Sequence, residues 1–203
     1  QTGKKTYRMK MNLRYVPNSP AMERAAARFL FKDSISSTLE GAVYVFLRSL
    51  GDKEIDPKLA DDPDGNYQFQ LAPQAGKAGK YQSYHASYLK SDVTRGKKKE
   101  GDTVKKRSNQ YDFAYDVKQQ RILTLNDVMT PEGVATLQRE TGAKNIQFHV
   151  ADGSLFFYYK QNGKRIGQEL WAIEDDNRVF FSDYYWKLTD IRLPKPGQEQ
   201  MLA

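Results

Sequence analysis

Residues 109–117 read Asn-Gln-Tyr-Asp-Phe-Ala-Tyr-Asp-Val, and large side chains occupy every second position of this stretch. The large residues are Tyr111, Phe113, Tyr115 and Val117, and they alternate with Gln110, Asp112, Ala114 and Asp116. A period of two residues is that of a β-strand with one buried face. The tyrosine-rich residues 81–93 predict a second strand, and the basic segment 94–107 is the hairpin tip or loop between the two.

Downstream of this hairpin the sequence predicts further strands and one inserted helix. The expected strands cover residues 146–150, 155–160, 169–173 and 178–181, with Asn162-Gly163 as a strong hairpin signal. A helix capped by Asn126 or Thr130 is expected near 131–140, and Gly142 ends it. Residues 183–191 fit either a strand or a helix.

Upstream of the hairpin the chain predicts one strand and two helices. Residues 6–16 alternate between apolar and basic or amide side chains, as in a strand with one solvated face. Ser19 and Pro20 are a helix N-cap and first position, so a helix is expected over 20–31. A second helix is expected over 35–50, followed by an acidic turn over 52–64, a short strand over 67–71 and a connection over 72–80.

This order of elements predicts an α+β fold with mainly antiparallel sheets. The N-terminal strand and helices form one predicted lobe, 1–78, and a β-rich lobe with one inserted helix follows over 79–196. A single continuous domain, 1–196, is the alternative. Residues 197–203 are a polar tail.

The charge of the 203-residue chain is concentrated in two short segments. The net charge is +7, of which residues 1–14 carry +5 and residues 96–107 carry +4, so the remainder is −2. The pI is near 9.3. A chain that is otherwise close to neutral favours a local anionic contact over a broad nucleic-acid face. Aromatic residues make up 12% of the chain, which excludes general disorder.

Residues 111–129, YDFAYDVKQQRILTLNDVM, resemble a segment of the RsiV-like extracytoplasmic domains. These domains occur in bacterial anti-sigma factors and as accessory modules of some peptidoglycan deacetylases. Residues 150–158 are similar to a second family segment, an Asp-Gly turn followed by an aromatic strand. The sequence departs from the family pattern at Gly96-Lys97-Lys98-Lys99, which has no histidine, at Gln120 in place of a turn glycine, and at Met129 in place of phenylalanine. The resemblance implies a binding role in a bacterial cell envelope, outside the cytoplasmic membrane.

Two groups of residues are candidates for binding. The first group is basic and consists of Lys97, Lys98, Lys99, Lys105, Lys106 and Arg107. These residues would capture an anionic partner. The alternative is that they only keep a hairpin tip solvated. The second is Tyr184, Tyr185 and Trp186, a sugar-stacking platform or, alternatively, part of the core. The expected partners are an envelope protein or an anionic glycan or wall polymer, ahead of nucleic acid.

No catalytic, metal or cofactor motif stands out. The chain has no cysteine, and its two histidines, His85 and His149, both fall in predicted strands. Acidic Asp61–Gly65 fails the spacing of a calcium loop, and Gly76–Lys80 lacks the context of a phosphate loop. No catalytic residue, metal or cofactor is therefore assigned.

The favoured function is a non-catalytic binding or sensing module that is periplasmic or at the cell surface. The chain begins at Gln1, which we interpret as a mature form after removal of a signal peptide, with an internal domain boundary as the alternative. No apolar run is long enough to span a membrane. The alternative functions are a carboxylate-dependent enzyme acting on carbohydrate or peptidoglycan, and a nucleic-acid-binding protein.

Overall fold

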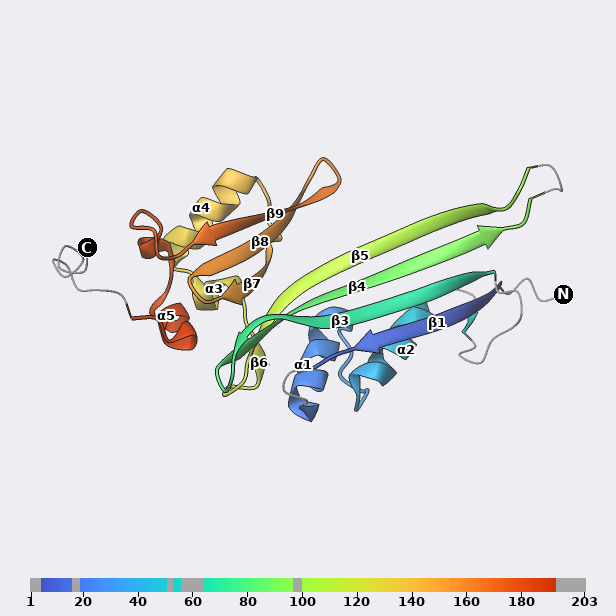
Figure 1. Cartoon of the computed structure of the whole chain (residues 1–203), viewed down its shortest axis with the longest axis horizontal. Helices are drawn as coiled ribbons and strands as arrows, with labels where there is room; N and C mark the ends of the chain where they lie inside the picture. The colour runs from blue at the N-terminus through green and yellow to red at the C-terminus, as the bar shows by residue number, and fades with distance from the viewer. Residues whose placement is uncertain (1–4, 16–18, 51–52, 56–63, 97–99, 193–203) are drawn as a thin grey trace. The chain divides into compact units, whose positions relative to one another are not determined.

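The computed structural model describes residues 5–15, 19–50, 53–55, 64–96 and 100–192. It confirms the predicted α+β class, with antiparallel pairing dominant (Figure 1). The strands are β1 (Lys5–Leu13), β2 (Lys53–Ile55), β3 (Gly65–Lys77), β4 (Tyr81–Thr94), β5 (Thr103–Asp116), β6 (Arg121–Ile122), β7 (Gln147–Ala151), β8 (Ser154–Gln161) and β9 (Lys164–Trp171). The helices are α1 (Pro20–Phe31), α2 (Leu39–Ser49), α3 (Leu125–Val128), α4 (Pro131–Thr141), α5 (Asp183–Thr189) and the 3-10 turn η1 (Arg178–Phe180).

The strands form two sheets. One has the order β2-β1-β3-β4-β5-β6 and the other the order β7-β8-β9. Strand β1 runs parallel to both of its neighbours, β2 and β3. The chain divides into two compact units, each made of two stretches: unit 1 is Gln1–Pro73 with His85–Tyr111, and unit 2 is Gln74–Tyr84 with Asp112–Ala203.

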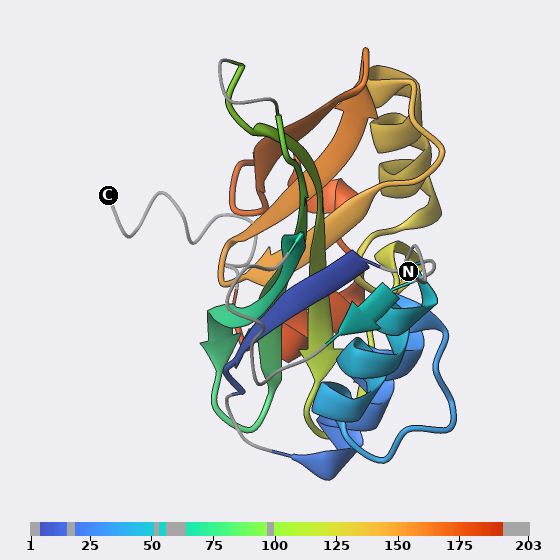
Figure 2. The ribbon, with the colours of Figure 1, turned by 90° about the vertical axis from the view of Figure 1, so that its right-hand side faces the viewer.

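In unit 1, helices α1 and α2 cover one face of the sheet (Figure 2). Phe31 of α1 lies 5.5 Å from Phe69 of β3, and Phe46 of α2 lies 5.6 Å from Tyr88 of β4, measured between ring centroids. The core beneath the helices is apolar and fully buried: Met22, Ala26, Leu39, Ala42, Val43, Leu47, Tyr67, Phe69 and Leu71. Side chains at alternate positions of the strands therefore point away from the helices.

The two helices begin where side chains cap them. Ser19 accepts a hydrogen bond from the amide of Met22, as predicted for α1. The prediction that α2 begins at 35 is wrong, because Asp33 holds the next residues in a turn and Thr38 caps the helix instead. The Asp33 carboxylate accepts the amides of Ile35 and Ser36 at 2.9 and 2.8 Å. Asx turns of this kind compete with helix formation.

Residues 72–77, expected as a connection, continue strand β3, so the turn before β4 is short. The basic hairpin is also longer than expected, since β5 already begins at Thr103. An ion pair of 2.9 Å joins Arg95 and Asp102 beside the tip.

Unit 2 packs α3, α4 and α5 with strands β7, β8 and β9 around one apolar core. Residues 183–189 are helical, which settles the open choice for that segment. Residues 178–180 form a 3-10 turn, so the predicted strand over 178–181 is wrong. The prediction failed because Phe180 and Phe181 pack against the core from a turn, and a short apolar run in a turn has the same residue pattern as a buried strand.

Candidate binding face

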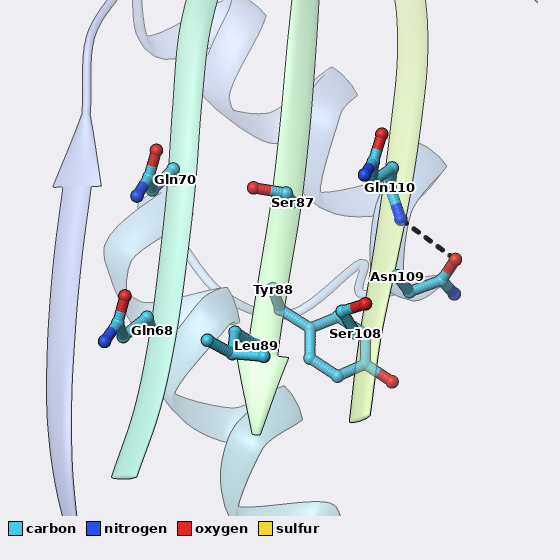
Figure 3. Close-up of a pocket in the computed structure, with 8 residues that line it drawn as sticks. All are labelled: Gln68, Gln70, Ser87, Tyr88, Leu89, Ser108, Asn109 and Gln110. Atoms are coloured by element: carbon cyan, nitrogen blue, oxygen red, sulfur yellow. Dashed lines mark hydrogen bonds between the residues drawn. The ribbon is translucent and has the colours of Figure 1, made fainter. Parts of the chain in front are cut away.

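A shallow hollow lies on the face of the unit 1 sheet that the helices leave uncovered (Figure 3). Its volume is about 260 Å³, and strands β3, β4 and β5 line it. Most of the residues that line it are polar: Gln68, Gln70, Ser87, Ser108, Asn109 and Gln110. Tyr88 and Leu89 complete the lining.

The alternation of the strands explains why these polar side chains gather here. Tyr67, Phe69 and Leu71 of β3 are fully buried, so Gln68 and Gln70 between them face the other side. Ser108 and Gln110 of β5 are exposed, with the half-buried Asn109 between them. Neighbouring strands thus place carboxamides and hydroxyls side by side (Figure 3).

The parallel pairing of β1 with β3 adds basic side chains to this face. Lys10 is in register with Gln68, Arg8 with Asn66, and Asn12 with Gln70. Arg8, Lys10 and Asn12 are exposed. We call this surface the polar face and define it by Arg8, Lys10, Asn12, Gln68, Gln70, Ser87, Lys106, Ser108 and Gln110.

The polar face is cationic because nearby acidic side chains of unit 1, such as Asp92, point to the opposite face of the sheet. Among the described positions of unit 1 that alternate onto it from β1, β3, β4 and β5, none is Asp or Glu, and Asp112, the next position on β5 with the same alternation, belongs to unit 2. Asp92 instead accepts a hydrogen bond from the Tyr7 hydroxyl and pairs with Lys90 at 3.5 Å. The charge on the face is therefore set by arginine and lysine.

The carboxamides of the face are available to a ligand. In the described part of the chain, no hydrogen bond engages the side-chain amides of Gln68, Gln70 or Gln110. Asn109, in contrast, donates to the Tyr111 hydroxyl at 3.0 Å and accepts the amide of Gln110 at 3.0 Å. Burial raises the pKa of the Tyr111 phenol.

Of the predicted basic residues, Lys97, Lys98 and Lys99 lie outside the described residues. Lys105, Lys106 and Arg107 are exposed on β5. Because β5 alternates, Lys106 shares a face with Ser108 and Gln110, whereas Lys105 and Arg107 point the other way. The sequence predicted a hairpin tip or loop here, whereas the structure places Lys105, Lys106 and Arg107 in β5, and it did not reveal that β3, beyond β4, supplies amides to the same face.

The predicted aromatic group lies in α5 of unit 2. Tyr185 is fully buried, and its hydroxyl donates to the backbone oxygens of Ala151 and Ser154. Tyr184 donates to the carboxylate of Asp116, and Trp186 packs against the unit 2 core. These contacts favour the core interpretation of the group over a sugar-stacking platform.

A charged cluster in unit 2 was not predicted. The Asp112 carboxylate accepts a hydrogen bond of 2.6 Å from Arg165 and lies 3.2 Å from His149 Nδ1. The Tyr158 hydroxyl lies 3.1 Å from the same nitrogen, and the Arg165 guanidinium lies 4.2 Å above the Tyr158 ring. Burial, then the charge of Asp112, raise the pKa of Tyr158 to about 12, although Arg165 opposes the shift.

This cluster holds one carboxylate that is compensated by a cation. Glycoside hydrolysis requires two carboxyl groups facing one bond at roughly 5–10 Å. The cluster therefore does not supply the acid and base of the alternative enzymatic function. Among the described residues, no group of three or more His, Asp or Glu is placed to hold a metal ion.

Comparisons with known proteins leave the family open. No protein-family model matches the chain, and no curated protein matches it. The chain is similar in structure to a DUF3298 family protein from Pseudomonas aeruginosa PAO1, with 11% sequence identity and a TM-score of 0.44. That match covers 80% of this chain and 78% of the other. In the helices that the structure describes, no segment is long and apolar enough to cross a bilayer.

Proposed function

We propose that this chain is a non-catalytic binding module that holds an anionic glycan on the polar face. The observation that carries the proposal is the row of unengaged carboxamides beside the basic residues of β1. Each glutamine amide offers two donors and an acceptor, which suits sugar hydroxyls. Lysine and arginine attract the carboxylates of an acidic sugar.

The composition of the face distinguishes this ligand from nucleic acid. Sheets that bind single-stranded nucleic acid stack bases on exposed aromatic side chains. The one aromatic residue among those that line the hollow, Tyr88, is 7% exposed and packs its ring against Phe46 of α2, so it offers no exposed ring for stacking. Hydrogen bonds and charge are the means of recognition that remain.

The proposed setting is the bacterial cell envelope, outside the cytoplasmic membrane. Its support is the resemblance of residues 111–129 to the RsiV-like domains. An acidic wall polymer or a glycan carried by an envelope protein is then the natural source of the ligand.

Titration calorimetry with an oligogalacturonate tests the proposal, with a neutral oligosaccharide of equal length and polyphosphate as comparison ligands. We expect the oligogalacturonate to bind most tightly, with an affinity that falls as salt rises. The variants Lys10→Gln and Gln68→Ala/Gln110→Ala should each weaken it. Arg24→Gln on α1 is the matched control, because Arg24 is exposed on the helix side.

Equal binding of polyphosphate, with equal losses in Lys10→Gln and Arg24→Gln, would reduce the effect to general charge and contradict the proposal. Amide NMR shifts that avoid residues 68–70 and 108–110 would place the ligand elsewhere. Cleavage of the oligosaccharide would show an enzyme instead of a binding module.

A further inference from the structure

An apolar groove lies on the opposite side of unit 1, between α1, α2 and the turn that joins them. Its volume is about 410 Å³. The apolar part of its lining consists of Phe31, Ile35, Ala42, Val45 and Phe46. We call it the helical groove.

Two aliphatic side chains stand unusually far out of the protein at this groove. Ile35 is 94% exposed and Val45 is 55% exposed. Ile35 is not on a loose loop, because Asp33 holds its amide at 2.9 Å and the Ser36 hydroxyl at 2.7 Å. The turn thus displays an isoleucine in a fixed position, where solvent exposure brings no benefit to folding.

The floor of the groove is formed by packed aromatic rings. Phe31 and Phe46 stack with their ring centroids 4.7 Å apart. Each of these rings also packs on the sheet, through Phe69 and Tyr88 respectively. A ligand side chain entering the groove would meet a preformed surface, which lowers the entropic cost of binding.

The rim of the groove is basic. Lys32, the C-cap residue of α1, lines it, and Arg28 is exposed in the last turn of α1. On α2, Arg48 follows Val45 by three residues and is exposed. Within the lining, Asp33 offsets Lys32, because hydrogen bonds with Ser36 and Ile35 lower the pKa of this carboxyl, so the positive excess around the groove comes from Arg28 and Arg48.

We propose that the helical groove is a docking site for an acidic amphipathic helix of a partner protein. Apolar side chains at i, i+3 and i+4 of such a helix would cover Ile35, Val45 and the stacked phenylalanines. Its flanking carboxylates would face Lys32, Arg28 and Arg48. A second copy of this chain is disfavoured as the occupant, because two basic rims would repel each other.

The groove and the polar face lie on opposite sides of the unit 1 sheet, so they form two separate binding sites. The partner helix and the glycan can therefore bind at the same time. The docking proposal does not depend on the glycan proposal, and either can fail alone.

Fluorescence anisotropy with a labelled 18-residue helical peptide tests the docking site. The peptide carries Leu at i, i+3, i+4 and i+7, Glu at the positions that flank them and Ala elsewhere, and the comparison peptides carry Lys in place of Glu or a scrambled order. We expect the acidic amphipathic peptide to bind. Ile35→Ser/Val45→Ser should weaken it at least about tenfold, since central apolar contacts dominate such interfaces. Lys32→Glu/Arg48→Glu should weaken it and favour the basic peptide.

Val179→Ser is the matched control, because Val179 is 60% exposed in unit 2 and should leave peptide affinity unchanged. All these positions are exposed, so circular dichroism and thermal melts should match those of the native chain. Absence of binding, equal binding of the scrambled peptide, or an equal loss in Val179→Ser would overturn the proposal. If the native chain is a dimer and Ile35→Ser is a monomer, self-association replaces the partner helix as the function of the groove. If the native chain binds anionic vesicles and Ile35→Ser does not, the groove binds a lipid surface instead. Either result would overturn the proposal.

Discussion

The Arg165 guanidinium donates a hydrogen bond of 2.6 Å to the carboxylate of Asp112, although 53 positions separate the two residues. The carboxylate is buried, with 2% of the Asp112 side chain exposed against 21% for Arg165. This pair ties the end of β5 to strand β9 within unit 2. Gln147 joins them, since it accepts from both the Asp112 amide and Arg165.

Replacing Arg165 with Gln should destabilise the protein by about 2–4 kcal/mol, because it leaves a buried carboxylate without its cation. The partial exposure of Arg165 keeps the figure below that of a fully buried pair. Urea unfolding monitored by fluorescence measures the effect. Lys164→Gln, an exposed neighbour on β9, is the control and should change stability by less than about 0.5 kcal/mol. A similar loss in both variants would show that the Asp112 pair has no special role.

Asp127 predicts a stability change that depends on pH. Although partial burial alone would raise its pKa, hydrogen bonds from Arg121 and Thr124 lower it below the usual range. Asp127 accepts two bonds from Arg121, at 2.8 and 3.1 Å, and caps α3 through the Thr124 amide at 2.7 Å. Its contribution should be complete above the unfolded pKa of about 4 and should fade as pH falls through the folded pKa.

Asp127→Ala should therefore cost about 1–2 kcal/mol at pH 7, as for the loss of a helix cap. At pH 2–3 the native protein and the variant should approach each other in stability. Thermal unfolding at the two pH values measures this difference. A gap that is the same at both would mean that packing, and not the charge of Asp127, accounts for it.

Replacing Gly133 of α4 with alanine should lower stability, the opposite of the usual effect of this substitution in a helix. Replacing a helical glycine with alanine normally stabilises a protein by about 1 kcal/mol. Here a Cβ atom would lie 2.4 Å from the Phe180 backbone oxygen and 3.0 Å from the Met129 methyl carbon. Gly133→Ala should therefore lower the melting temperature, because α4 and the η1 turn would have to separate. An increase in melting temperature would show that the two elements do not pack this closely.

Buried tyrosines predict weakening in alkali. Burial is the main cause that raises the pKa values of Tyr7, Tyr67, Tyr81, Tyr184 and Tyr185. Their stabilising effect is present below the unfolded pKa of about 10 and is lost as pH rises above it, because only the unfolded chain then ionises freely. Melting temperature should fall steeply between pH 10 and 11.5. Tyrosinate absorbance should show that the folded chain ionises later than the chain in denaturant, and coincident curves would contradict the burial of these phenols.

Local patterns in the sequence predicted the elements that local chemistry controls. Ser19 and Pro20 located the start of α1, and the alternation of 109–117 located β5. The start of α2 was missed because Asp33 followed by Ser34–Ser36 fits both a helix N-cap and the turn that actually forms. Two features depend on contacts between distant segments: the parallel register of Lys10 with Gln68 and the pairing of Asp112 with Arg165. Periodicity within one segment does not predict which distant segment it pairs with.

Strand alternation gives the sharpest prediction for the polar face. Lys105, Lys106 and Arg107 are adjacent, exposed and equal in charge, but only Lys106 alternates onto the face with Ser108 and Gln110. Lys106→Gln should therefore weaken oligogalacturonate binding more than Lys105→Gln or Arg107→Gln. All three variants lower the net charge by one. If long-range attraction alone held the ligand, the three variants would therefore lose the same amount of affinity. Calorimetry at about 50 and 150 mM salt separates the cases, since screening suppresses the long-range part and leaves the direct contact of Lys106. Equal losses at both salt concentrations would remove the polar face as the glycan site and leave the chain's general charge as the cause.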